Sequence, residues 1–128
     1  NDSGAMTILQ DIILKDNLNG EARIELAQLF ERAAIEAEEE TKKAEYYARA
    51  KMYFDQAMQI EGSAAMAAQR CGQMYANRAD YVKAVPFLQK AFQLKPRDEL
   101  DQYIKRVERA ARRQEAKAAA DKASAPKA

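Results

Sequence analysis

The side chains that most often do chemistry in proteins are scarce in this sequence. Among its 128 residues there is no histidine and a single cysteine, Cys71. The lack of histidine removes the commonest general base, the commonest transition-metal ligand and every catalytic triad that uses imidazole. Cys71 cannot form an intramolecular disulfide and lies among small residues, as a core thiol would. No glycine-rich phosphate loop, CxxC pair or nucleophile elbow is present. We therefore expect a protein that is not an enzyme and uses no cofactor.

One cluster of carboxylates remains to be considered, in the stretch Glu36, Glu38, Glu39 and Glu40. A metal-binding loop turns its oxygen ligands inward around a glycine, and a catalytic carboxylate pair needs a cleft. Neither is indicated in this stretch. We expect these acids to be solvated and to hold no metal.

A basic patch lies near the other end of the chain. On a helix, most of its cations share one face, which could meet phosphates or an acidic partner. Two glutamates interrupt that face, and Tyr103 is the only aromatic residue nearby for base stacking. We expect a solvated helix surface here, with nucleic-acid binding as the less favoured alternative. The patch consists of Lys105, Arg106, Arg109, Arg112 and Arg113.

Composition favours helices as the elements that position these groups. Four glycines and three prolines stand against many Ala, Glu, Lys, Gln and Arg residues, and no segment alternates as a strand does. With 48% apolar residues, one domain of this length can bury a core. No apolar run approaches the length of a membrane span. The net charge of +1 hides a gradient, because residues 1–62 sum to about −6 and residues 63–128 to about +7.

A spacing of 34 residues organises the middle of the chain. Residues 65–98 predict two helices, the first with Cys71, Gly72 and Tyr75 on one face and the second ended by Pro96. Small residues at the crossing let the two helices approach closely. Five residues of like character lie one period earlier, so the same hairpin occurs twice. The pairs are Tyr47 and Tyr81, Ala50 and Ala84, Phe54 and Leu88, Ala57 and Ala91, and Gly62 and Pro96.

These residues and this period resemble the tetratricopeptide repeat, a helix-turn-helix unit of about 34 residues. The sequence departs from the family pattern at Ala68, Cys71 and Ala79, where tryptophan, leucine and glycine are frequent. The resemblance implies an all-α fold, a short right-handed α-solenoid of antiparallel hairpins with about six helices.

The expected organisation is one helical domain over residues 1–113. It comprises a helix over 4–16, a long hairpin over 20–61, the regular repeat over 65–98 and a capping helix over 99–113. The long hairpin has an insertion of 11 residues between Phe30 and Tyr47, which we expect to lengthen both helices by about one and a half turns. The Ala/Lys-rich tail over 114–128 should fray into disorder, because it has no large apolar residue to hold it.

The resemblance also implies a binding surface. In tetratricopeptide arrays the first helices of successive repeats line a concave groove that receives an extended peptide or a partner helix. Amide and guanidinium donors there can hold the backbone and side chains of a bound segment. The clamp that some members use for a terminal carboxylate is not reproduced, since only Arg70 supplies a suitable charge. The groove residues would be Ile24, Gln28, Arg32, Met66, Gln69, Arg70, Gln73 and Asn77.

We therefore expect a non-catalytic scaffold that binds a partner protein or peptide through this groove or through the projecting hairpin. The alanine-rich composition is typical of bacterial proteins and favours a soluble assembly factor of the cytoplasm or periplasm. Two alternatives stay open. One is binding of nucleic acid or an acidic partner by the basic patch. The other is self-association, as a structural module of a larger protein, through the apolar face of Ala5–Leu14.

Overall fold

The computed structural model describes residues 2–124 and contains six helices and no strand within that range. The helices are α1 (Asp2–Lys15), α2 (Gly20–Glu36), α3 (Glu40–Met58), α4 (Ala64–Asn77), α5 (Tyr81–Leu94) and α6 (Asp98–Ala123). The prediction of an all-α fold with about six helices is confirmed. None of the described helices is both long enough and apolar enough to cross a lipid bilayer.

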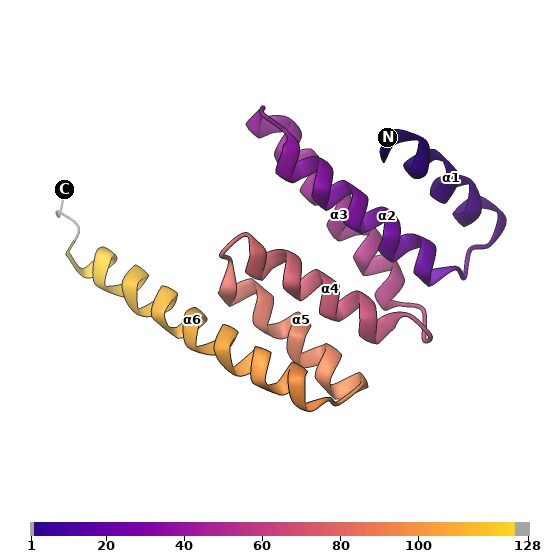
Figure 1. Ribbon diagram of the computed structural model, residues 1–128. Coiled ribbons are helices and arrows are strands. Elements are labelled where there is room, and N and C mark those ends of the chain that lie inside the picture. The colour runs from indigo at the N-terminus through magenta and orange to yellow at the C-terminus, as the bar shows by residue number, and fades with distance from the viewer. Residues whose placement is uncertain (1, 125–128) are drawn as a thin grey trace.

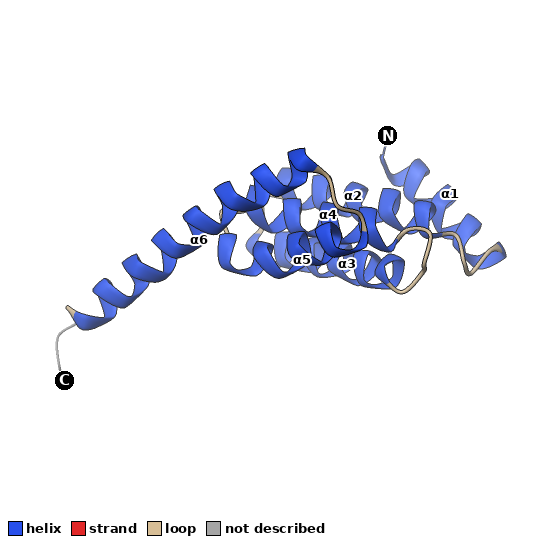
Figure 2. Cartoon of the chain, turned by 90° about the horizontal axis from the view of Figure 1, so that it is seen from below, coloured by secondary structure: helices blue, strands red, loops and turns tan. Residues whose placement is uncertain are grey.

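The helices form two stacked hairpins flanked by a single helix on either side (Figure 1). The hairpins α2–α3 and α4–α5 are the most closely packed pairs, and α3 lies against α4 to join them. At one end α1 packs on α2, and at the other α6 packs on α5. Seen from below, α6 runs out past the rest of the molecule (Figure 2). This order of contacts is that of a helical repeat, in which each element touches its neighbours in sequence.

Apolar positions on matching faces of the two hairpins form the core; Phe54 and Leu88 lie one 34-residue period apart, whereas Leu26 and Ala27 lie 45 residues before Cys71 and Gly72. Leu26, Ala27 and Cys71 on the first helices and Phe54 and Leu88 on the second helices are all fully buried. In α6 the stripe of apolar residues is buried too, and it packs on the preceding hairpin. The same face-sharing rule that predicted the hairpins therefore accounts for most of the core. The stripe residues are Leu100, Ile104 and Val107.

Gly72 sets the distance between α4 and α5. A Cβ atom added at Gly72 would lie 2.6 Å from both Cγ and Cδ2 of Leu88, and 3.2 Å from the Leu88 backbone nitrogen. Such contacts are too short to form without moving α5, so only glycine allows the two helices to cross this closely. The close approach predicted at this position is confirmed.

The hairpin α2–α3 is longer than α4–α5, as predicted, but the two helices are lengthened unequally. Its helices have 17 and 19 residues, and those of α4–α5 have 14 each. α3 begins seven residues before Tyr47, whereas α5 begins at the matching Tyr81, so α3 is extended at the tip by about two turns. The extension of α2 is about one turn. The ion pairs near the tip lie within α3, where Glu45 is 3.8 Å from Lys42 and 3.9 Å from Arg49. Both ion pairs run along one helix.

The last helix continues past residue 113, where the tail was expected to begin, and ends at Ala123. Two contacts explain the difference. Ala111 is buried, and the Gln114 side chain accepts a hydrogen bond from the Tyr81 backbone nitrogen at 3.1 Å and donates one to the Ala79 carbonyl. These contacts hold α6 to the turn between α4 and α5, and the alanines beyond it favour helix. The remainder of the expected tail, residues 125–128, lies outside the described residues.

Candidate partner-binding surface

Part of the predicted groove lies between the beginnings of α2 and α4. A cavity of about 250 Å³ is found there, lined by Ile24, Met66 and Gln69 among others. Ile24 is buried, whereas Met66 is 41% exposed and offers its thioether at the surface. Lys95 and Arg97, in the connection between α5 and α6, add positive charge to this cavity.

A second cavity, of about 210 Å³, continues along α4 toward the first turns of α6. Gln69, Gln73 and Arg97 line it on one side, and Tyr103 and Arg106 line it from α6. Gln69 and Arg97 belong to both cavities, and the Arg97 guanidinium donates a hydrogen bond to the Gln69 amide oxygen. The two cavities therefore form one surface along α4, which we call the α4 groove.

Tyr103 is the aromatic residue of the α4 groove. Its ring is half-buried, and the Arg106 guanidinium carbon lies 5.8 Å from the ring centroid. Burial raises the pKa of the Tyr103 hydroxyl, and the nearby Arg106 opposes this rise. The phenol is therefore neutral at physiological pH and can donate or accept a hydrogen bond.

Gln28 and Arg32 do not join the α4 groove. They face α1 on the other side of α2, where a cavity of about 480 Å³ opens. We call this second surface the α1–α2 groove. It is lined by Ala5, Ile8, Leu9 and Ile12 of α1 and by Glu25, Gln28, Leu29 and Arg32 of α2.

Arg70 and Asn77 are engaged within the fold instead of lining either groove. Arg70 is half-buried, and its Nη1 donates to the Gln73 amide oxygen at 3.3 Å. Asn77 forms a side-chain hydrogen bond with Glu31. Partial burial raises the pKa of Glu31, and the bond to Asn77 opposes that rise. Neither residue lines the α4 groove or the α1–α2 groove.

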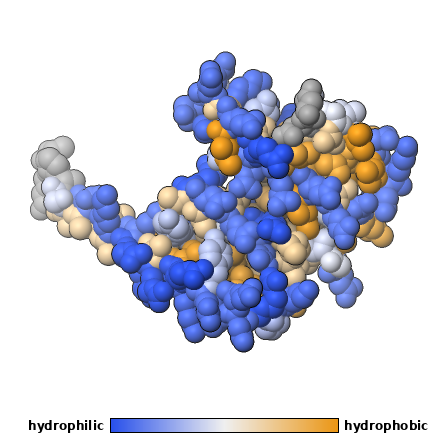
Figure 3. Space-filling model, in the orientation of Figure 1, coloured by the Kyte–Doolittle hydropathy of each residue, from blue (hydrophilic) through white to orange (hydrophobic). Residues whose placement is uncertain are grey.

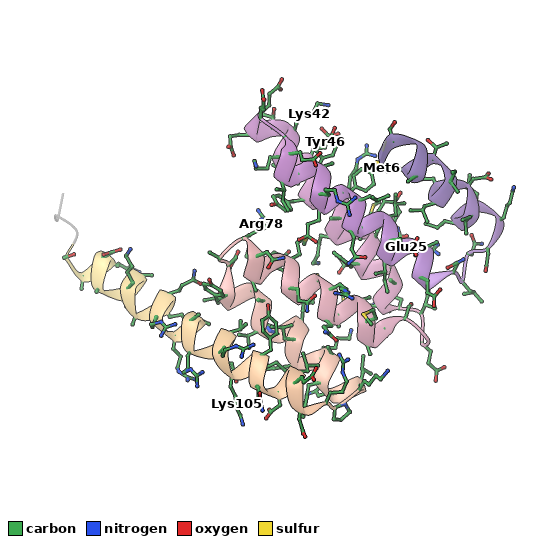
Figure 4. The ribbon with its side chains drawn as sticks, in the orientation of Figure 1. Met6, Glu25, Lys42, Tyr46, Arg78 and Lys105 are labelled. Atoms are coloured by element: carbon green, nitrogen blue, oxygen red, sulfur yellow. The ribbon has the colours of Figure 1, made fainter. Side chains whose placement is uncertain are left out.

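The residues of the basic patch are all exposed on α6, as predicted, but they face different surroundings. Arg106 lines the α4 groove, whereas Arg112 lines a separate cavity against α5. Lys105 points outward from α6 (Figure 4), with its ammonium 3.0 Å from the Asp101 carboxylate. Arg109 and Arg113 lie on the exposed surface between these sites. The patch is thus divided between a groove and a solvated ridge.

The interior cysteine and the lysine beside it are surrounded by groups of the fold itself. Cys71 is fully buried, and this burial raises the pKa of its thiol to about 12, although Lys51 nearby acts in the opposite direction. A thiol with this pKa is protonated and unreactive at neutral pH. Lys51 lies 2.8 Å from the Asp55 carboxylate and 5.3 Å from the centroid of the Phe87 ring. Within residues 2–124, no group of three or more potential ligands is arranged to hold a metal ion.

Sequence reasoning missed the residues that the loop between α5 and α6 contributes to the α4 groove. Lys95 and Arg97 flank Pro96, which in the sequence indicates only the end of a helix. The spacing predicts packing for Tyr103 and a basic patch for Arg106, yet both line the groove. A signal was available, because residues next to the buried stripe that begins at Leu100 must border the neighbouring helix.

No protein-family model and no curated protein matches the sequence, so the comparison with known proteins assigns no function to these grooves.

Proposed function

We propose that this chain is a non-catalytic interaction module, and that it binds an extended segment of a partner protein in the α4 groove. The observation that carries the proposal is the continuity of the two cavities through Gln69 and Arg97. Together they give a path along α4 with apolar, amide and cationic groups in turn. Extended segments are recognised by such a path, because their backbone needs hydrogen-bonding partners and their side chains need separate subsites.

The chemistry of the groove supports this function. Met66 adapts its flexible thioether to different apolar side chains, which suits a surface that accepts a range of sequences. Gln69 and Gln73 each offer an amide donor for a peptide backbone, while their amide oxygens accept from Arg97 and Arg70. Arg97 and Arg106 line the same cavity as Gln73 together with Glu99, and Lys95 and Arg97 line the first cavity together with Glu21. In each cavity the cations outnumber the carboxylates, and the net positive charge favours a segment that carries carboxylates.

Selection from a random-peptide library tests the proposal and needs no identified partner. The intact chain is immobilised, bound peptides are enriched, and their affinities are then measured for the chain and for Met66→Glu. We expect the substitution to weaken binding at least about tenfold, because it puts a carboxylate at the apolar subsite and repels acidic segments. Amide shifts in nuclear magnetic resonance spectra should move along α4 and the first turns of α6.

Met52→Glu is the matched control. Met52 lies on α3 and is 44% exposed, close to the 41% of Met66, but it lines neither part of the α4 groove. Selected peptides should bind Met52→Glu as tightly as the unmodified chain. Peptides that bind both variants equally well would show that the α4 groove is not the binding site, and so would amide shifts confined to other helices.

A further inference from the structure

The α4 groove adjoins a third cavity, which lies beside the loop between α1 and α2. This cavity measures about 330 Å³, and Asp16, Leu18 and Glu21 are among the residues that line it. Glu21 and Ser63 also line the cavity between the beginnings of α2 and α4, so the path along α4 continues into the third cavity. The loops that precede α2, α4 and α6 follow one another along one edge of the molecule (Figure 1). We call the third cavity the loop cavity.

Contacts within the fold hold the loop cavity in shape. One oxygen of the Asp16 carboxylate accepts a hydrogen bond from the Leu18 backbone nitrogen at 3.1 Å. The Ser63 hydroxyl donates to the Ala57 carbonyl at 2.8 Å, which fixes the loop before α4. A Cβ atom added at Gly20 would clash with the Ser63 side chain, so the loops before α2 and α4 are in direct contact. A preorganised cavity of this kind loses little conformational entropy when it binds a ligand.

The loop cavity offers carboxylates beside apolar side chains. Asp16 and Glu21 are both exposed, and within residues 2–124 neither forms an ion pair. Leu18, which is 76% exposed, and the half-buried Ile60 line the same cavity. Hydrophobic atoms gather over α1 and α2, the helices that this loop joins (Figure 3). A lysine or arginine side chain matches both features, because its apolar stem can cover Leu18 while its charged end meets the two carboxylates.

The sign of the charge changes along the path. Among the described residues, two carboxylates and no lysine or arginine line the loop cavity. The cavities along α4 hold an excess of cations, from Lys95, Arg97 and Arg106. From Ser63, just before α4, to Gln73, the path follows ten residues, which is about 15 Å along the helix axis. An extended segment rises about 3.3 Å per residue, so about five of its residues cover this distance.

We infer that the partner segment carries a lysine or arginine that binds in the loop cavity and, about five residues away, an aspartate or glutamate that binds beside Arg97 and Arg106. This inference rests on the proposed function, because it names the charge pattern of the segment that the α4 groove binds. The pattern fixes the register of the segment, since a shift along the path brings like charges together. Segments that are acidic throughout lack the contact with Asp16 and Glu21 and bind more weakly.

Charge reversal on both sides of the contact tests the inference. A peptide is selected from the random library on the unmodified chain, and a second peptide is made in which glutamate replaces its basic residue. Glu21→Lys should weaken binding of the selected peptide about tenfold, because the introduced ammonium repels its basic residue. The second peptide should bind the unmodified chain about tenfold more weakly than the selected one does, and it should regain most of that loss on Glu21→Lys.

Glu25→Lys is the matched control. Glu25 lies about one turn further along α2 and is also exposed, so its replacement changes the net charge equally, but it lines the α1–α2 groove. Both peptides should bind Glu25→Lys as they bind the unmodified chain. Circular dichroism checks that each variant keeps its helices, which is expected for exposed positions.

Two results would overturn the inference and leave the α4 groove as the binding site. The first is a set of selected peptides that Met66→Glu weakens but that carry no basic residue about five positions from an acidic one. The second is an equal effect of Glu21→Lys and Glu25→Lys on a peptide with that pattern. Peptides that Met66→Glu does not weaken contradict the proposed function itself, and with it this inference.

Discussion

Ala79 has the least favourable backbone conformation in the described chain. Its φ is +59°, in the left-handed region that residues with a Cβ rarely adopt. The conformation is required because α4 ends there. The backbone nitrogen of Asp80 donates to the Tyr75 carbonyl at 2.9 Å, and that of Ala79 donates to the Ala76 carbonyl at 2.9 Å. This pair of bonds is the usual helix ending in which glycine occupies the left-handed position.

Ala79→Gly should therefore stabilise the protein. The substitution relieves the strain of a left-handed Cβ but increases the freedom of the unfolded chain, and the net gain should be about 0.5–1 kcal/mol. Urea unfolding followed by circular dichroism measures the change. Ala76→Gly, inside α4, provides the comparison and should lose about 1 kcal/mol. If both glycines destabilise equally, the left-handed assignment of Ala79 is wrong.

The buried thiol of Cys71 predicts a loss of stability in alkaline solution. Burial raises its pKa from 9.0 to about 12, so the unfolded chain releases this proton at a lower pH than the folded chain does. The contribution is fully present below pH 9 and is lost as the pH rises from 9 towards 12. Between pH 8 and pH 10 the free energy of unfolding should fall by roughly 1 kcal/mol through this group alone.

Comparison with Cys71→Ala isolates this contribution, because tyrosines and lysines titrate in both proteins over the same range. The difference in unfolding free energy between the two proteins should shrink by roughly 1 kcal/mol from pH 8 to pH 10. A constant difference would mean that the thiol ionises with a similar pKa in the folded and unfolded chain.

The observed helices agree well with the sequence prediction where buried residues repeat. They agree less well where a single polar contact determines where a helix ends. The 34-residue spacing predicted the second helices of both hairpins, because buried residues recur there on the same face, and the first helices match at an offset of 45 residues. The unequal lengthening of α2 and α3 was not predictable, because alanines and charged residues continue a helix equally well in either. The end of α6 was misjudged for another reason. Gln114 continues the stripe of Leu100, Ile104, Val107 and Ala111, but an amide on an apolar stripe does not by itself indicate a partner.

Gln114→Ala tests whether that side chain holds the extension of α6. It removes both hydrogen bonds to the turn between α4 and α5, at the Tyr81 nitrogen and the Ala79 carbonyl. We expect a loss of about 1–2 kcal/mol in the free energy of unfolding and faster amide exchange after residue 114. Gln102→Ala, at an exposed position of the same helix, should change neither quantity. Unchanged exchange in Gln114→Ala would show that helix propensity alone maintains the extension.

The candidate surface could be predicted only in part, because it depends on how the helices and loops are arranged in the whole molecule. The pattern of the first helices indicated one shared surface for Ile24, Met66, Gln69 and Gln73, and these four residues line the two cavities of the α4 groove. It could not show that Gln28 and Arg32 face α1 on the other side of α2, because that depends on how α1 packs along α2. Nor could it place Arg97, since the path of a loop depends on the helices that it joins.

Stability should be graded along the chain, because each helix contacts mainly its neighbours. The hairpins α2–α3 and α4–α5 share most of the packing, whereas α1 packs only on α2 among the closely packed pairs, and α6 beyond Gln114 is exposed. Amide exchange in dilute solution should therefore be slowest and nearly uniform in α2 to α5 and faster in α1 and in the end of α6. Equal protection of all six helices in dilute solution would mean that the chain opens only as a single cooperative unit, and that α1 is held by more than its contact with α2.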